Sequence, residues 1–186
     1  MLTPTPSGTQ AVGSGVVSCS ITDGIATVSF YHPKSNSLPA VLLNDIAGRI
    51  AAVSKHPACR VVVIRSDGAG SFCAGASFDE LKQIDSPDAG KEFFMGFARI
   101  ILAMRRCPKP IITRVQGKVV GGGVGLVAAS DYALAVPEAP ARLSELAVGI
   151  GPFVVGPAIE RRIGASAFSA MRSEERRVGK ECRSRW

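Results

Sequence analysis

Two glycine-rich stretches, FCAGAS at residues 72–77 and KVVGGGVGL at residues 118–126, decide the fold. Each follows a run rich in β-branched residues, 60–66 or 110–115, and each precedes a segment with helical character. At such a strand-to-helix turn, the first N–H groups have no acceptor within the helix, and small residues let a ligand oxygen approach them. Two turns side by side could hold one oxygen and form an oxyanion hole if that oxygen gains negative charge. For either turn alone, tight packing of strand on helix explains the glycines equally well.

The segments around these turns alternate between strands and helices. Residues 16–20 and 25–30 favour strands, and Asp23-Gly24 between them predicts a hairpin turn. Residues 60–66, 110–115 and 132–136 predict further strands, while apolar spacing and stop signals predict helices over 40–55, 79–84, 86–106 and 121–129. This alternation after an initial hairpin predicts an α/β fold with a largely parallel sheet.

Three motifs in a fixed order carry a resemblance to a known family. They are FCAGASFDEL (72–81), PKPIITRVQGKVVGGGVGLVAASDYALA (108–135) and LSELAVGIGP (143–152). Over about residues 16–171 the chain resembles the enoyl-CoA hydratase/isomerase (crotonase) superfamily. The resemblance implies a crotonase-like spiral of ββα units and an acyl-CoA thioester substrate whose carbonyl oxygen is held by two peptide N–H groups. By position these N–H groups belong to Ala76 and Gly122, and the further substrate-binding positions are Ala74, Gly75, Ser77, Gly121 and Gly125.

The acidic residues of the motifs bear on the reaction. In hydratases of this family one glutamate follows the glycine triplet and a second lies in the later motif, whereas this chain has Gly125 at the first position and Glu145 at the second. A hydratase conventionally uses two carboxylates to hold and polarise water, but one carboxylate suffices to move a proton between two carbons. The pattern is similar to that of the Δ3,Δ2-enoyl-CoA isomerases, with Glu145 as the catalytic residue.

Other functions remain open at this stage. An enoyl-CoA hydratase, a lyase of fatty-acid or branched-chain acid degradation, is one alternative. A non-catalytic acyl-CoA-binding relative is another, because the first acid is absent at Gly125. Without the resemblance, Glu145 would be read as an exposed carboxylate on a helix face.

Composition excludes several classes of protein. The chain has 186 residues, of which 46% are hydrophobic and 20% charged, as in a globular protein. Its longest uncharged apolar stretch, 119–130, is too short to span a membrane, and residues 1–15 resemble a flexible tail rather than a signal peptide, so we expect a cytoplasmic protein. Five cysteines without a CxxC pair indicate neither a disulfide framework nor a zinc site. We expect no metal and no cofactor apart from the CoA of the substrate.

The C-terminal segment distorts the charge of the chain. The formal net charge is +7, and residues 172–186, RSEERRVGKECRSRW, contribute +3 of it. This segment resembles the in-frame translation of a common sequencing adapter, so we expect it to be non-native and the domain at 16–171 to be incomplete at its C-terminus. The remaining charge is too scattered to indicate nucleic acid, although it suits an anionic acyl-CoA. For the full-length protein the resemblance implies a homotrimer or a dimer of trimers.

Overall fold

The computed structural model describes residues 10–12 and 15–172, and its centre is a six-stranded sheet with the order β1-β2-β3-β4-β5-β7. The first two strand pairs are antiparallel and the other three are parallel, which confirms the predicted α/β fold. The strands are β1 (Gln10–Val12), β2 (Gly15–Thr22), β3 (Ile25–Tyr31), β4 (Val61–Ser66), β5 (Ile111–Val115) and β7 (Tyr132–Ala135).

The hairpin between β2 and β3 is the predicted one. Thr22 pairs with Ile25, so the loop contains only Asp23 and Gly24. Both loop residues have positive φ, 51° and 85°, as a two-residue turn that matches the twist of the strands requires.

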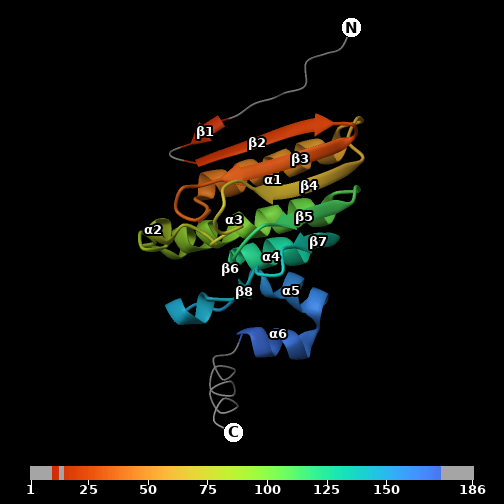
Figure 1. Cartoon of the computed structure of the whole chain (residues 1–186). Coiled ribbons are helices and arrows are strands. Elements are labelled where there is room, and N and C mark those ends of the chain that lie inside the picture. Colours follow the sequence, from red (N-terminus) through yellow and green to blue (C-terminus); the bar gives the residue numbers. More distant parts are fainter. Residues whose placement is uncertain (1–9, 13–14, 173–186) are drawn as a thin grey trace.

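Helices connect the parallel strands. Helix α1 (Ala40–Lys55) joins β3 to β4, α3 (Pro87–Arg106) lies between β4 and β5, and α4 (Gly122–Ala129) lies between β5 and β7. Figure 1 shows α1 and α3 side by side on one face of the sheet. Helix α2 (Phe78–Leu81) is a single turn, shorter than the predicted segment 79–84.

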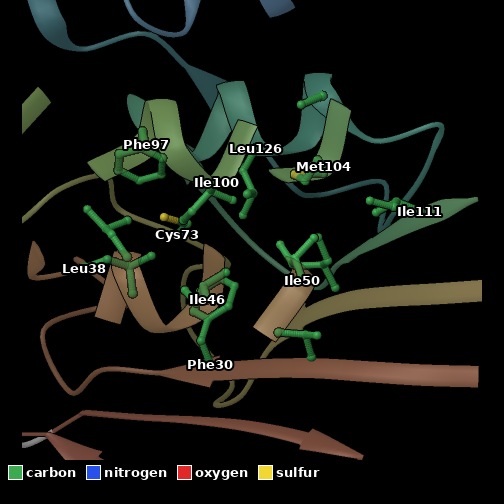
Figure 2. Packing of buried hydrophobic residues seen from close by; sticks show 14 of the residues in the cluster. Phe30, Leu38, Ile46, Ile50, Cys73, Phe97, Ile100, Met104, Ile111 and Leu126 are labelled. Atoms are coloured by element: carbon green, nitrogen blue, oxygen red, sulfur yellow. The ribbon is translucent and has the colours of Figure 1, made fainter. Parts of the chain in front are cut away.

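One apolar core lies between these helices and the sheet. Figure 2 shows Ile46 of α1 beside Phe30 of β3, with Ile50 of α1 and with Ile100 and Met104 of α3 in the same cluster. All five side chains are buried, because they lie at helical or alternating spacing on the faces that meet. This core fixes the ends of β4 and β5, from which both glycine-rich turns emerge.

The part of the chain around and after the second turn contains elements that the sequence pattern does not predict. Strands β6 (Val119–Val120) and β8 (Ala141–Arg142) form a separate parallel pair, and the 3-10 helix η1 (Glu145–Val148) follows. Helices α5 (Gly156–Ile163) and α6 (Ala165–Arg172) end the described chain and lie beyond β7 and α4 in Figure 1. Two-residue strands and eight-residue helices are too short to show a clear hydrophobic period.

The predicted N-terminal tail needs correction at its inner end, whereas the non-native origin of residues 172–186 stays a prediction. Residues 10–12 form β1 and residue 15 begins β2, so this part of the predicted tail 1–15 belongs to the sheet. Arg172 is the last residue of α6, and its guanidinium lies 5.6 Å from the centre of the Phe168 ring. The remainder of both predicted tails, residues 1–9, 13–14 and 173–186, lies outside the described residues.

Three chemical features of the described chain bear on function. No helix in residues 10–12 and 15–172 is long and apolar enough to cross a membrane. The cysteines in this part, Cys19, Cys59, Cys73 and Cys107, are free thiols. The same residues contain no group of three or more His, Cys, Asp or Glu side chains arranged to hold a metal ion.

Candidate active site

Backbone hydrogen bonds hold the two glycine-rich turns together. The N–H of Cys73 donates to the carbonyl of Lys118 at 3.3 Å, and the N–H of Val120 donates to the carbonyl of Cys73 at 2.8 Å. Cys73 and Val119 thus form a short parallel bridge outside the main sheet. The turn after β4 and the turn after β5 therefore lie side by side, as the oxyanion-hole hypothesis requires.

Glycines allow this close approach. Gly75 and Gly121 have φ angles of 93° and 55°, a conformation that side chains with a Cβ rarely adopt. A Cβ on Gly123 would lie 2.8 Å from the Cβ of Cys73, and a Cβ on Gly122 would collide with the Phe97 ring. The glycines are thus required for packing, and packing brings the N–H groups of both turns together.

The N–H groups of Ala76 and Gly122 are among those of these turns that remain available to a ligand. Within the described part of the chain, the N–H groups of Ala76 and Gly122 donate to no acceptor. A Cβ on Gly75 would lie 3.8 Å from the nitrogen of Gly122, so the residue before Ala76 directly adjoins the start of α4. The first N–H groups of a helix also carry its positive dipole end, which favours a negatively charged oxygen there.

The pair β6 and β8 brings Glu145 to the same place. Val120 pairs with Arg142, and the N–H of Gly121 donates to the carbonyl of Arg142 at 2.9 Å. Three residues after Arg142, Glu145 begins η1. A Cβ on Gly121 would lie 3.4 Å from Oε1 of Glu145, so the carboxylate rests against the turn that precedes Gly122.

The surroundings of Glu145 suit a general base. Its Oε2 accepts a hydrogen bond from the N–H of Ser144 at 2.9 Å, which fixes the orientation of the carboxylate. Burial raises the pKa of the Glu145 carboxyl, and hydrogen bonds from its own N–H and from that of Ser144 partly oppose this effect. A raised pKa makes the ionised carboxylate a stronger base. A general base is most effective when its pKa lies near the pH at which it works, so an upward shift suits this role at neutral pH.

A cavity of about 190 Å³ contains these groups. Of the positions expected to bind substrate, Ala74, Gly75, Ala76, Gly121 and Gly122 line it together with Glu145. Ser77 and Gly125 do not line the cavity. The Ser77 hydroxyl instead caps α2 by accepting the N–H of Glu80 at 3.4 Å.

The rest of the cavity wall is largely apolar and was not expected from the sequence. The stripe that contains Phe93 and Phe97 indicates a helix face buried in the core, but in the structure α3 turns this face partly toward the cavity. The adjacent pair Phe93-Phe94 is the available signal, since neighbouring helical residues point about 100° apart and so widen the apolar face beyond a single stripe. The remaining wall residues are Ser37, Phe78, Leu81, Ser144, Val148, Ile150, Gly151, Pro152, Val154 and Val155.

Gly125, the position of the first acid in hydratases, is covered by another side chain. A Cβ on Gly125 would lie 2.5 Å from Cγ1 and 2.6 Å from Cβ of Val155, and 3.3 Å from Cδ1 of Ile101. Val155 is 3% exposed and itself lines the cavity. The space into which a side chain at position 125 would extend is therefore filled.

The two turns and the Glu145 carboxylate lie at one cavity of an α/β fold, and comparisons with known proteins identify the family of the chain. The sequence matches the family described as enoyl-CoA hydratase/isomerase over residues 20–182, so the chain belongs to that family. The matched range includes part of the segment 172–186, whose non-native origin stays a prediction.

Known relatives and one solved structure are similar to most of this chain. A Rhodococcus jostii protein named (7aS)-7a-methyl-1,5-dioxo-2,3,5,6,7,7a-hexahydro-1H-indene-carboxyl-CoA hydrolase is 32% identical over 132 residues, 71% of this chain and 51% of that protein. The probable enoyl-CoA hydratase of Bacillus subtilis is 26% identical, over 89% of this chain and 64% of its own. The crystal structure of a putative enoyl-CoA hydratase/isomerase (crotonase) from Legionella pneumophila matches with a TM-score of 0.80 and 26% identity, over 84% of this chain and 61% of that one. The chain thus has the crotonase fold and spans less than two thirds of each of these three proteins.

Proposed function

We propose that this chain carries the active site of an acyl-CoA enzyme that shifts the double bond of an enoyl-CoA, with Glu145 as its only acid-base group. The observation that carries the proposal is that Glu145 is the one carboxylate lining the cavity in the described part of the chain. Val155 fills the space beside Gly125, where a second carboxylate would have to enter. A single carboxylate can return the proton that it removes.

The geometry supports the following reaction. The Glu145 carboxylate removes a proton from C2 of a 3-enoyl-CoA, and the electron pair left behind delocalises onto the thioester oxygen. The N–H groups of Ala76 and Gly122 stabilise the resulting dienolate, an effect typically worth about 2.7–4 kcal/mol per donor. The protonated Glu145 then delivers the proton to C4, which leaves the double bond between C2 and C3. No water is consumed and the carboxylate is regenerated.

Hydration is the alternative with the most support from named relatives. The Bacillus subtilis relative is named a probable enoyl-CoA hydratase. In hydration a water molecule adds across the double bond. With a single carboxylate in the cavity, Glu145 alone would have to orient the water and supply the proton. The closed space at Gly125 argues against a second carboxylate for this task.

The proposal is tested by presenting the wild-type protein with three reactions. Formation of the conjugated thioester from a 3-enoyl-CoA reports isomerisation, and loss of the conjugated thioester from a 2-enoyl-CoA reports hydration. Release of free CoA reports hydrolysis of the thioester, which is included because the Rhodococcus relative is named a hydrolase. We expect isomerisation to be the fastest. Faster hydration or hydrolysis would overturn the isomerase proposal, and acyl-CoA binding without turnover would identify a non-catalytic relative.

Two further properties belong to the same proposal. The partner is an acyl-CoA thioester whose CoA is part of the substrate, and no separate cofactor is needed. The assembly of the full-length protein as a homotrimer or a dimer of trimers stays a prediction from the family resemblance. Its place in fatty-acid metabolism is likewise proposed.

A further inference from the structure

We propose that Val155, backed by Ile101, ends the acyl part of the cavity and restricts the enzyme to short acyl groups. The inference rests on the proposed acyl-CoA function and adds a specificity-determining residue to it. It follows from the position of Val155 at the closed end of the cavity, from the tight contacts behind it and from a second hollow lined by the neighbouring Ile101.

The cavity has an open end and a closed end. Phe78 and Val148 on its wall are 50% and 47% exposed, which places them at the mouth. Phe97 and Val155 on the same wall are only 5% and 3% exposed. The nucleotide part of CoA is large and charged, so it must remain at the mouth, and the acyl group points toward Phe97 and Val155.

The side chains at the closed end of the cavity are tightly packed. The Val155 side chain lies against the backbone of Gly125, as the 2.5 Å separation between its Cγ1 and a Cβ built on Gly125 shows. Ile101 contacts Gly125 from the neighbouring side, with its Cδ1 at 3.3 Å from the same Cβ position. A chain that reaches Val155 can advance only if these side chains move, and densely packed interiors resist such movement.

A second hollow lies behind this wall. It has a volume of about 480 Å³, and its apolar lining comes from Ile101 of α3, Ala129 of α4 and Ala158 of α5. The rest of its lining is partly charged and includes Arg105, Asp131, Arg161 and Arg162. Ile101 is one helical turn beyond Phe97, and Ala129 is one turn beyond Gly125, so the hollow continues the groove between the same three helices. Ile101, which adjoins Val155 at Gly125, therefore lies between the cavity and the second hollow.

A smaller side chain at position 155 should open the closed end of the cavity toward the second hollow. Each methylene that enters an apolar pocket improves binding about fourfold, because about 0.8 kcal/mol is gained per buried CH₂. In the wild-type protein only the first few carbons of the acyl chain can be buried and contribute this gain. We expect Val155→Ala to let more carbons enter the cavity, and Val155→Ile to let fewer enter.

The test measures equilibrium binding of two saturated, unreactive thioesters, butyryl-CoA and decanoyl-CoA, by titration calorimetry on the 186-residue chain. We expect Val155→Ala to lower the dissociation constant of decanoyl-CoA relative to that of butyryl-CoA by about tenfold or more. Val53→Ala is the matched control, since Val53 is 5% exposed, lies in α1 and lines neither hollow, and we expect the wild-type ratio. Val155→Ile should shift the ratio in the opposite direction and tests the inference if the alanine variant does not fold.

The outcomes separate this inference from the proposed function. Binding of both thioesters with an unchanged ratio in Val155→Ala and Val155→Ile overturns the role of Val155 and leaves the acyl-CoA function standing. A ratio that changes equally in Val53→Ala overturns it as well, because the effect is then not local. Failure of the wild-type protein to bind either thioester overturns the proposed function and this inference together.

Discussion

At the scale of single residues, two opposing effects determine the pKa of the Glu145 carboxyl group. Burial favours its neutral form, while hydrogen bonds from its own N–H and from that of Ser144 favour the carboxylate. Burial is the larger influence, so the pKa is raised. The Glu145 carboxylate therefore takes up a proton at a higher pH than an exposed glutamate does.

The raised pKa predicts the pH dependence of the reaction. Only the ionised carboxylate accepts a proton, so kcat/KM should rise with pH through a single ionisation whose midpoint lies above the range of an exposed glutamate. A pH profile of kcat/KM on the wild-type protein measures this. A profile that falls across the same range, or two ionisations of carboxylate type, would contradict a single base.

At the scale of elements, the N-terminus of α4 depends on the close contact of Gly123 with Cys73. Gly123→Ala would place a Cβ 2.8 Å from the Cys73 Cβ and 3.0 Å from its carbonyl oxygen, neither of which is the end of a flexible side chain. We expect a loss of about 1–3 kcal/mol in the free energy of unfolding, together with lower activity, because the two turns are pushed apart. Denaturant unfolding and an isomerisation assay measure the two effects.

Gly48→Ala is the matched control for that prediction. Gly48 lies within α1, and a Cβ there would meet nothing within 4 Å. The same substitution should stabilise the protein by about 0.5–1 kcal/mol, since alanine loses less backbone entropy in a helix than glycine does. Equal destabilisation by both substitutions would show that contact with Cys73 is not the cause.

The contact between α4 and Val155, just before α5, predicts a coupling between two substitutions. Gly125→Ala should be destabilising by about 1–3 kcal/mol because its Cβ meets Val155. In the double variant Gly125→Ala/Val155→Gly that obstacle is gone, so the loss should be smaller than the sum of the two single losses by about 1 kcal/mol or more. Gly48→Ala combined with Val155→Gly should be additive. Additivity at Gly125 would mean that position 125 is open to a side chain.

At the scale of the whole molecule, the sequence predicts five of the six strands of the main sheet and both glycine-rich turns, but not β1. The hairpin at Asp23-Gly24, helix α1 and the buried strands β4 and β5 follow from turn chemistry and from hydrophobic spacing, which are local signals. The positions of Ala76, Gly122 and Glu145 follow from the family motifs, and the structure brings all three to one cavity.

Features that depend on contacts between distant segments could not be predicted. The pairing of β6 with β8 involves two residues on each strand, too few for a periodic pattern. The filling of the space at Gly125 depends on Val155, thirty positions later in the chain, and only the packing of α4 beside residue 155 brings them together. A residue's type and spacing carry no information on such a contact.

The exposed side chains beside the cavity predict the solution behaviour of the chain. Phe153 is 83% exposed and lines a groove together with Leu146, which is 45% exposed. Apolar patches of this kind promote association. Phe153→Ser should increase solubility and change the free energy of unfolding by less than about 0.5 kcal/mol, whereas Phe168→Ser, at a 9% exposed position, should cost about 3 kcal/mol or more. Light scattering and denaturant unfolding distinguish the two, and unchanged solubility in Phe153→Ser would show that this patch is not responsible.

The central claim is that one carboxylate, Glu145, carries a proton from C2 to C4 of an enoyl-CoA. The most direct measurement follows a 3-enoyl-CoA labelled with deuterium at C2, by mass and NMR analysis of the product from the first turnovers in ordinary water. We predict that wild-type protein forms 2-enoyl-CoA with part of the deuterium at C4, and that Glu145→Gln still binds the thioester but reacts about 10²–10⁴ times more slowly. Product with only solvent hydrogen at C4 from the first turnover, or an undiminished rate in Glu145→Gln, would contradict the claim.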